Sequence, residues 1–574
     1  MKRLSRLLSA WLLTCQFVTA QTTTVTATKD DGTPAATKVP AGGTVNYTNT
    51  ITNTGSNAAT NMSITDPDIT NASMVPGSLQ VSPIAYNDAY TAGTVFAHTS
   101  INTNNTSEFS VTANDYVGIN ADNPATITIT AFDSTSAGNG IISMVTSGAD
   151  MGKFSYEPAP GFTGIDTFNY TITNSAGMTD SAVVSITVTG PVVWYVNGTT
   201  GSDTTGKGTL SSPYASVNRA ATASSAGHKI FVSSGTYNGT AITLEANEML
   251  IGQGVVGASF DAVVLGGTPS ADTTPARPAI NGTKPSVARL SGGNTVTLSN
   301  GNTIVGCTIT NSGGGYAVSG SGITTLQIGN AAPGAAAADT QLTSTSTSLG
   351  CLSLTGAASG NVNVTAQISA TVGRSLNISD RTGGTLSIIG KVTDNGSGAL
   401  FSSNTGATLN LRCLVLSTSS NTALAASGGG TLNITNGVSD GIDNDGDGST
   451  DEADEANTIT TTSGQALNVT STNIGASGLT FRSISSGAGT NNGITLVSTG
   501  TAGGLTVTGD GSANSGGTIS GKTGSNGSNT EGIGIYLSNT SNVSLNRMLL
   551  QNFQNFAIRG FNVSGFTMAN CTVN

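Results

Sequence analysis

Short runs of alternating apolar and polar residues recur from residue 22 to the end of the chain, and each run is bounded by Gly, Asn or Ser. Alternation with a period of two is typical of β-strands, whereas the helical period of 3.6 residues is almost absent. One segment departs from this pattern, because PYASVNRAATASSAG, near residues 213–227, has the spacing of a helix. The pattern therefore predicts a nearly all-β protein.

Two columns of apolar residues repeat with a period of about 24 residues in the C-terminal part of the chain. The first column, at intervals of 24, is Leu352, Leu376, Leu400 and Leu424. The second, at intervals of 24, 23 and 23, is Val362, Leu386, Leu409 and Leu432. A solenoid requires such columns, because each coil stacks the same side chain on its neighbour. We therefore expect both columns to point inward.

The same repeat continues to the last residues, since Ile535 to Ile558 and Val543 to Phe566 are both 23 residues apart. With one coil per strand spacing, residues 228–574 predict roughly fourteen or fifteen coils and a rod of about 70 Å. The chain stops at NCTVN, inside a strand of an unfinished coil and without a polar cap. We expect it to be a fragment truncated at its C-terminus.

The segment that leads into this repeat begins VVWYVNGTTGSDTTGKGTLSSPYASVNRAATASSAGHKIFVSSGTYNG. It resembles the start of bacterial right-handed parallel β-helices, in which a short capping helix precedes the first coil. The resemblance implies a right-handed parallel β-helix over residues 191–574, with its capping helix near 213–227.

Residues 21–80 form the first of two predicted β modules before the solenoid. Their strands GTVNYTNTITNTG and AATNMSITDP match a Gly-led strand, a TxTNTG run and a VxDP-like ending, at Gly43 to Gly55 and Ile64 to Pro67. This pattern resembles the DUF11 family of bacterial surface repeats. The resemblance implies an Ig-like sandwich that serves as a spacer or stalk.

Residues 81–190 form the second module, which closes with FSYEPAPGFTGIDTFNYTITNSAGMTDSAVVSITV. The signature residues in this run are Tyr156, Pro158, Gly161, Phe162, Gly164, Asp166, Phe168 and Tyr170. The run is similar to the cadherin-like and Ig-like tandem domains of large bacterial adhesins, which implies a second β-sandwich. The DxNDN calcium motif of cadherins is missing, and Asn174 stands where an acidic residue is expected.

The N-terminus, MKRLSRLLSAWLLTCQFVTAQ, has a basic start, a short apolar run and small residues before Gln21. Residues 1–20 are therefore predicted to be a secretory signal peptide, and no later segment is apolar enough to span a membrane. A lipoprotein at Cys15 is the alternative, for which Thr14 is a poor preceding residue. Cleavage removes three basic residues from a chain whose net charge is already −11, which argues against nucleic acid as a partner.

Four cysteines remain after cleavage: Cys307, Cys351, Cys413 and Cys571. Their spacings resemble neither a zinc site nor a small disulfide framework, although the chain is predicted to be exported. Each lies in a β-rich run such as TIVGCTIT or LNLRCLVL. We expect buried, free cysteines that pack as small core residues.

The stretch DGIDNDGDGSTDEADE, residues 440–455, holds eight carboxylates in a chain of which only 9% is charged. After Leu424 the next member of its column is Leu467, 43 residues later, and removing nineteen residues restores the period of 24. The acidic block is therefore predicted to be a loop, residues 438–456, inserted into a regular coil.

The spacing within this loop is DxDxDGxxDxxD, in which alternate carboxylates flank a Gly that permits a sharp turn. Calcium binds about six to eight oxygens at about 2.3–2.6 Å, and such a loop can wrap one ion. The predicted ligands are the side chains of Asp443, Asp445 and Asp447, the backbone carbonyl of Ser449, Asp451 directly or through water, and Asp454 as the closing carboxylate.

This loop resembles the calcium loops of thrombospondin type 3 and dockerin repeats, which also close with Asp, and the DGxDNDxDGxxDE motif of bacterial surface proteins. It differs from an EF-hand, which closes with Glu between two helices. The resemblance implies calcium as the bound ion. The alternative is a solvated acidic loop that binds no specific ion, because runs of like charge are often disordered.

Catalysis is considered because right-handed β-helices include pectate lyases and polygalacturonases. Cleavage of a polysaccharide usually needs carboxylates that converge on one face. One coil after Asp380 is Asn404, and the motifs NTD and GHG are absent. Arg374 and Arg381, beside Asp380, form the strongest remaining polar cluster, which is interpreted as a solvated turn.

The sequence thus predicts a secreted or cell-surface, structural or adhesive protein with no catalytic activity: two sandwich modules followed by a calcium-binding β-helix. Its partner would be a surface glycan or a protein. The alternative is a carbohydrate-active β-helix, a polysaccharide lyase or hydrolase. A face with exposed aromatic residues and converging carboxylates would favour the enzyme, whereas a face of Thr, Ser and Asn would favour adhesion or structure.

Overall fold

A computed structural model describes residues 25–30, 48–53, 82–96, 101–102, 110–117, 126–239, 241–266, 277–330, 339–346, 349–444 and 449–574. The predicted signal peptide lies outside these residues. Of the DUF11-like module, the structure describes only β1 (Val25–Asp30) and β2 (Thr48–Asn53), which pair antiparallel. The chain divides into two compact units, which are described separately below.

The first unit contains an Ig-like domain of two small sheets. The four-stranded sheet has the order β3 (Asp88–Phe96), β9 (Thr179–Thr189), β8 (Gly164–Asn174) and β5 (Ile127–Phe132). The three-stranded sheet has the order β4 (Ile101–Asn102), β7 (Phe154–Glu157) and β6 (Ile141–Met144). In β8 and β9 buried residues alternate with more exposed ones, as expected of strands with one face on a core.

Four of the signature residues, Tyr156, Asp166, Phe168 and Tyr170, are buried in the core of this domain. Phe154 and Phe168 pack edge to face with ring centroids 5.2 Å apart. Asp166 is 1% exposed, and its carboxylate accepts hydrogen bonds from the Tyr156 hydroxyl at 2.6 Å and from the backbone N–H of Gly138 at 2.6 Å. A buried carboxylate is stable only when its oxygens are hydrogen-bonded, so Asp166 fixes the adjacent loop. This part of the signature therefore has a structural role.

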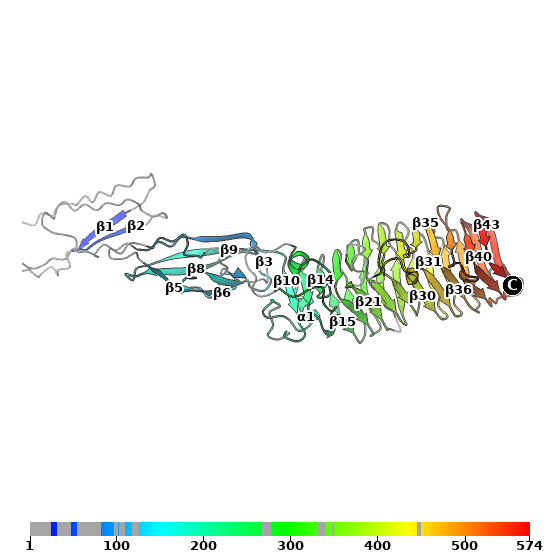
Figure 1. Cartoon of the computed structure of the whole chain (residues 1–574), viewed down its shortest axis with the longest axis horizontal. Coiled ribbons are helices and arrows are strands. Elements are labelled where there is room, and N and C mark those ends of the chain that lie inside the picture. The colour runs from blue at the N-terminus through cyan, green and yellow to red at the C-terminus, as the bar shows by residue number, and fades with distance from the viewer. Residues whose placement is uncertain are drawn as a thin grey trace, which may run out of the picture. The chain divides into compact units, whose positions relative to one another are not determined.

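The second unit is a parallel β-helix built from three sheets whose strands stack coil upon coil (Figure 1). The first sheet has thirteen strands: β10 (Val193–Val196), β11 (Lys229–Val232), β14 (Met249–Gly252), β17 (Asn302–Val305), β20 (Leu326–Ile328), β23 (Val362–Val364), β26 (Thr385–Ile388), β29 (Thr408–Arg412), β32 (Thr431–Thr435), β35 (Asn473–Phe481), β38 (Leu505–Val507), β41 (Ser544–Asn546) and β44 (Thr567–Ala569). The second sheet has twelve: β12 (Thr236–Asn238), β15 (Ser286–Arg289), β18 (Thr308–Asn311), β21 (Gln341–Ser344), β24 (Gln367–Ala370), β27 (Val392–Asp394), β30 (Leu414–Thr418), β33 (Thr458–Thr461), β36 (Ser483–Ser486), β39 (Gly517–Ser520), β42 (Met548–Gln551) and β45 (Thr572–Val573). The third sheet has eleven: β13 (Ile242–Thr243), β16 (Val296–Thr297), β19 (Tyr316–Ser321), β22 (Gly350–Thr355), β25 (Arg374–Ser379), β28 (Ala399–Ser402), β31 (Leu424–Ser427), β34 (Leu467–Thr470), β37 (Ile494–Val497), β40 (Ile533–Ser541) and β43 (Phe556–Ser564). The predicted all-β fold with a parallel β-helix is confirmed.

The start of the β-helix differs in one respect from the expectation. Strand β10 precedes helix α1 (Val217–Ala223) and pairs in parallel with β11, so the first sheet begins before the helix. The helix is shorter than the predicted segment 213–227. It begins after Ser216, whose side chain accepts the N–H of Arg219 at 3.2 Å, and it buries Val217 and Ala220. Neither this helix nor any other helix in the described ranges is long and apolar enough to cross a membrane.

The first sheet has thirteen strands, fewer than the fourteen or fifteen coils expected, because several connections between strands are longer than a turn. The largest of these lie between β14 and β15, where the chain includes a short π-helical turn, Asp261–Leu265, and between β32 and β33, where it includes a 3₁₀ turn, Ala453–Glu455. Residues spent on these excursions do not add coils.

The leucine column is correct except at one position. Leu352 pairs with Leu376, and Leu424 pairs with Leu467, all of them fully buried. In the coil between those of Leu376 and Leu424, however, Ala399 pairs with Leu424, and Leu400 pairs with Asn377 on the outer face. Successive side chains of a strand point to opposite faces, so a coil shorter by one residue turns Leu400 outward and brings Ala399 and Phe401 inside. The expectation that Leu400 points inward is wrong.

The second column is confirmed throughout. Val362, Leu386, Leu409 and Leu432 pair in succession along the first sheet, and none is more than 2% exposed. Three of the four cysteines, Cys307, Cys351 and Cys413, are buried and form no disulfide bond, as expected. The fourth, Cys571, is free and partly exposed in the last coil.

The interpretation of Arg381 as part of a solvated turn is wrong. Its side chain is 1% exposed and runs along the β-helix, where Nη1 donates to the carbonyl of Ile323 at 2.9 Å and Nη2 to that of Gly360 at 2.8 Å. Burial lowers the pKa of this guanidinium. Since Ile323 and Gly360 belong to two preceding coils, Arg381 ties three coils together through their turns.

Candidate functional site

The acidic insertion replaces a turn between the first and second sheets. In the preceding coil, β29 and β30 are separated only by Cys413, which has a positive φ of 51°. In the next coil the chain leaves β32 after Thr435 and enters β33 at Thr458. The coils on both sides keep their pairing, as Leu424 opposite Leu467 shows. The chain therefore makes a long excursion between β32 and β33 while the neighbouring strands stay paired.

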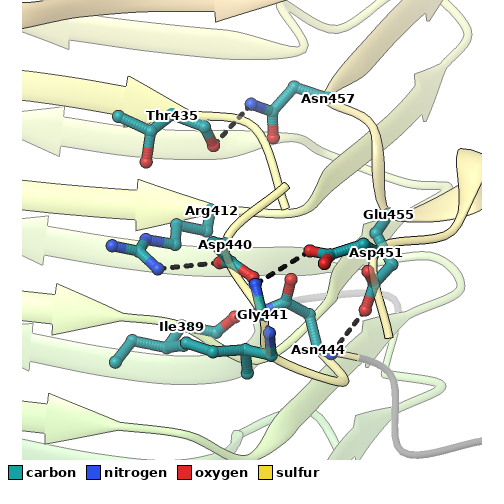
Figure 2. A network of polar contacts seen from close by, with 10 residues as sticks. Ile389, Arg412, Thr435, Asp440, Gly441, Asn444, Asp451, Glu455 and Asn457 are labelled. Atoms are coloured by element: carbon teal, nitrogen blue, oxygen red, sulfur yellow. Dashed lines mark hydrogen bonds and ion pairs between the residues drawn. The ribbon is translucent and has the colours of Figure 1, made fainter. Parts of the chain in front are cut away.

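Asn457 closes the base of the insertion (Figure 2). It is fully buried, and its Nδ2 donates to the carbonyls of Thr435 at 2.8 Å and Thr480 at 2.9 Å, while its Oδ1 accepts the N–H of Leu414 at 2.8 Å. These three partners belong to three successive coils. Asn457 thus satisfies the backbone groups that the interrupted turn leaves open. The sequence carries no signal for this role of Asn457, because the residue follows the acidic block and looks like an ordinary loop residue.

Two further buried residues, Glu455 and Asn444, fold the loop back on itself. Glu455 is fully buried and accepts the backbone N–H groups of Asn444 and, at 3.2 Å, Glu452. Asn444 is also fully buried. Its Nδ2 donates to the backbone carbonyl of Ile389 at 3.0 Å, and its backbone carbonyl accepts the N–H of Lys391 at 2.7 Å. The loop therefore lies against the turn of an earlier coil (Figure 2).

Three acidic residues of the block are held by neighbours outside or at the edge of the loop. Asp440 forms an ion pair with Arg412 at 2.7 Å, and Asp454 forms one with Lys391 at 2.8 Å. Asp451, which has a positive φ of 62°, accepts the N–H of Gly441 at 2.9 Å. These contacts reduce the repulsion between the carboxylates without any bound ion.

The predicted calcium ligands are only partly within the described residues. Asp445 and Asp447 lie outside them, Asp443 is partly buried, and Ser449, Asp451 and Asp454 are exposed. Among the residues that the structure describes, no group of three or more Asp, Glu, His or Cys side chains is placed to hold a metal ion. The carboxylate oxygens match the preference of calcium for hard ligands, but the fit depends on Asp445 and Asp447. Calcium binding stays a prediction.

A second candidate site lies on the outer face of the first sheet. One outward position carries an amide or hydroxyl side chain in six successive coils, and each pairs with the next: Thr303, Gln327, Asn363, Ser387, Asn410 and Asn433. We call this set the polar row. All six are partly buried. Four of them directly follow the residues of the apolar column Val362, Leu386, Leu409 and Leu432, so the spacing of that column also marks the polar row.

The polar row lines two adjoining hollows that share Ser387. The first has a volume of about 570 Å³ and runs over β17, β20, β23 and β26. The second, of about 260 Å³, continues over β26, β29 and β32 to Ser477. Together they form one trench, which we call the polar trench, across strands that lie about 4.8 Å apart. Its length from β17 to β32 is therefore about 24 Å.

The amides of the polar row bind partly to one another. Asn363 Nδ2 donates to Gln327 Oε1 at 2.9 Å, and Asn433 Nδ2 donates to Asn410 Oδ1 at 2.9 Å. An amide has two N–H donors and a carbonyl with two lone pairs, so one bond between two amides leaves further hydrogen-bonding capacity on both. The row is thus both held in place and able to bind a polar ligand.

Comparison with known proteins supports the two-part architecture. Residues 82–187 match a family described as bacterial Ig domain, and residues 199–376 match a family described as a protein of unknown function, DUF1565. No curated protein matches the chain. Among solved structures, the family 28 exopolygalacturonase of Yersinia enterocolitica aligns over 73% of this chain and 86% of its own, with 11% identity and a TM-score of 0.19. That similarity is too low to support a function.

The chain therefore combines a domain that matches the bacterial Ig family with a parallel β-helix. The first part of this β-helix matches the family of unknown function.

Proposed function

We propose that this protein is exported to the cell surface or the medium, where its β-helix acts as a structural or adhesive rod without catalytic activity. The observation that carries the proposal is the polar row, because the open face of the rod presents amides and hydroxyls where an enzyme of this kind would need acids. The bacterial Ig domain and the signal-like N-terminus support export.

The chemistry of the polar trench supports a non-catalytic role. Cleavage of a glycosidic bond requires two carboxyl groups, or a carboxylate with a second acid or base, on either side of the bond. Among the described residues that line the trench there is no Asp, Glu or His, and the one charged residue is Arg412, which is paired with Asp440.

One fully buried acid in the same coils has a structural role. Asp394 is fully buried, and its carboxylate accepts the backbone N–H groups of Ser375 at 2.6 Å, Gly396 at 2.8 Å and Gly398 at 2.9 Å. A buried carboxylate with three such backbone partners shapes the turn that it lies in. This geometry supports the proposal further.

We also propose that the acidic insertion binds one calcium ion, which orders the tip of the loop. Asp443, Asp445, Asp447, Ser449, Asp451 and Asp454 would hold the ion, and the ion would offset the repulsion between carboxylates. The base of the loop is fixed by Asn457 and Glu455 without an ion. Removal of calcium should therefore loosen the tip while the β-helix stays folded.

The test is incubation of the whole exported chain with pectin, polygalacturonate, alginate and xylan. No reducing ends and no unsaturated products should appear above the level of a heat-denatured sample. Sustained turnover on any of these polymers, abolished by a point substitution in the β-helix, would overturn the non-catalytic role. Surface proteolysis of intact producing cells tests export, since a protein that stays protected until lysis would contradict it.

A further inference from the structure

The outer face of the first sheet changes character along the rod. In its first strands the outward residues Tyr195, Phe231 and Ile251 are apolar, and they are covered by Phe260 and the π-helical turn that follows it. Tyr195 and Phe260 stack with ring centroids 6.2 Å apart. In β17 one outward residue, Val305, still belongs to this apolar cluster, whereas the other outward residue, Thr303, begins the polar row. The first hollow of the polar trench opens beside it. The same face is therefore sealed in one part and open in the next.

The open part is also bounded at its other end. Strand β35 does not continue the register of β32, because Leu432 pairs with Ile474 whereas Ile434 pairs with Leu479. The extra residues form a bulge in the first sheet, and Ser477 in this bulge lines the end of the polar trench. The polar trench is thus a bounded hollow that runs along the rod for about 24 Å.

We infer that the polar trench binds a neutral polysaccharide chain that lies along the axis of the β-helix. This inference rests on the proposed adhesive function and names the ligand class and its site. Each coil contributes one amide or hydroxyl from the polar row at intervals of about 4.8 Å, which is comparable to the length of a sugar unit in an extended chain. Sugar hydroxyls both donate and accept hydrogen bonds, as the amides of Gln327, Asn363 and Asn410 do.

Charge argues against an acidic polymer in the polar trench. Its lining contains one cation among the described residues, and that cation, Arg412, is neutralised by Asp440 at 2.7 Å. The whole chain has a net charge of −11, which repels polyanions such as nucleic acids or uronic acid polymers. A neutral chain avoids both difficulties.

The composition of the polar trench also argues against a protein partner. Protein interfaces depend on buried aromatic and unpaired Arg anchors, which dominate their affinity. None of the described residues that line the trench is aromatic, and its single Arg is paired. Because no ring is available for stacking, affinity must come from many small hydrogen-bond contributions. It should therefore increase steeply with the length of the bound chain.

The experiment is affinity electrophoresis of the full chain in native gels that contain soluble neutral or acidic polysaccharides. The neutral polymers are hydroxyethylcellulose, xylan and galactomannan, and the acidic ones are polygalacturonate and alginate. At least one neutral polymer should retard the wild-type chain. Titration calorimetry with the hexasaccharide and the trisaccharide of that polymer should then give affinities that differ by about tenfold, because each added sugar brings another coil into contact.

The test variant is Asn363→Ala/Asn410→Ala, which removes two amides from the polar row. The matched control is Gln341→Ala/Gln367→Ala, which removes another pair of amides that bond to each other across adjacent coils, at 2.6 Å, outside the polar trench. The test variant should bind the neutral polymer about tenfold more weakly, and the control should bind as the wild type does. If the test variant fails to fold, Ser387→Leu, which fills the point where the two hollows meet, replaces it.

The inference is overturned if no neutral polymer retards the chain, if only the acidic polymers do, or if both double variants bind equally. Retention on deglycosylated mucin, with none on the neutral polymers, would assign a protein ligand and would also overturn it. The gels are assayed for released sugars at the same time. Release of products would refute the non-catalytic role, whereas loss of binding alone would refute only the neutral-glycan assignment.

Discussion

Lys391 and Asp454 form an ion pair in which Nζ lies 2.8 Å from Oδ2, although 63 residues separate them in the sequence. Lys391 belongs to the turn between β26 and β27, and Asp454 is the residue expected to close the calcium loop. The Asp454 side chain is 59% exposed, so the pair is in contact with solvent and weak. A calcium ion at the loop would therefore compete with Lys391 for this carboxylate.

The first prediction concerns this competition. Lys391→Met should strengthen calcium binding about two- to fivefold, because the energy of an exposed ion pair no longer has to be given up. Asp443→Ala/Asp447→Ala should abolish binding at millimolar calcium, and magnesium should bind poorly, because it requires tighter octahedral geometry. Titration calorimetry on the full chain measures all three affinities.

Equal calcium affinity of the wild type and the Asp443→Ala/Asp447→Ala variant, or no binding by either, would show that the block is a solvated acidic loop. Arg412→Met serves as the control for Lys391→Met, since Arg412 pairs with Asp440, which is not a predicted ligand.

The second prediction concerns the core of the β-helix. Leu424→Ala should lower the free energy of unfolding by about 2–5 kcal/mol, because it removes fully buried methyl groups and leaves a cavity between Ala399 and Leu467. Leu400→Ala should cost less than about 1 kcal/mol, since Leu400 lies on the outer face. Urea unfolding followed by circular dichroism compares the two, and equal losses would contradict the register described above.

The third prediction concerns the base of the insertion. Asn457→Ala leaves two carbonyls and one N–H of successive coils without partners, which should lower the free energy of unfolding by about 2–4 kcal/mol. Hydrogen exchange of peptides that contain Leu414 and Thr480 should accelerate. Asn421→Ala, at an exposed turn where Nδ2 donates to one carbonyl at 3.2 Å, is the control and should change little. A result in which Asn421 matters as much as Asn457 would refute the role.

The fourth prediction concerns the pH dependence of the Ig-like domain. Burial, together with the nearby charge of Asp115, raises the pKa of Asp88 to about 7, and burial raises the pKa of Asp115 to about 6. Both groups hold their protons more tightly in the folded domain than in the unfolded chain. Their contribution to stability is therefore greatest below about pH 4 and is lost as the pH rises through 6 and 7.

Asp88→Asn should remove most of this loss, because the amide stays neutral at every pH. Hydrogen exchange of peptides from residues 127–187, measured at pH 5 and pH 8 and corrected for the intrinsic rate, tests this in the full chain. Asp133→Asn, an exposed carboxylate that accepts from Asn169 at 2.8 Å, is the control and should keep the pH dependence of the wild type. An unchanged pH dependence in Asp88→Asn would contradict the assignment.

The sequence predicted the solenoid and the inserted loop because both are properties of spacing. Val362, Leu386 and Leu409 repeat at the coil period, and the distance from Leu424 to Leu467 reveals the insertion directly. The prediction that Leu400 points inward failed because Leu400 and its neighbour Phe401 are both apolar. When two adjacent residues both suit the core, a coil that is one residue shorter cannot be recognised from hydrophobicity alone.

Buried polar residues were the other limit of the sequence analysis. Arg381 and Asn457 look like solvated turn residues, but each is buried because it bonds to backbone groups of other coils. Such partners are carbonyls and N–H groups, which every residue carries, so no sequence pattern marks them. The polar row was recognisable in principle, since it directly follows an apolar column, but its role depends on which stretch of the face is covered.

Because Leu424 still pairs with Leu467, the corner after Thr435 accommodates an inserted segment without disturbing the neighbouring coils. A peptide can leave and re-enter the coil there while the strands above and below stay aligned. Any segment whose two ends are close enough could take the place of residues 438–456, and the rod would show no change in pitch. The chemistry of the inserted loop can therefore change without changing the length of the β-helix. This makes the corner a suitable attachment point for engineered binding loops.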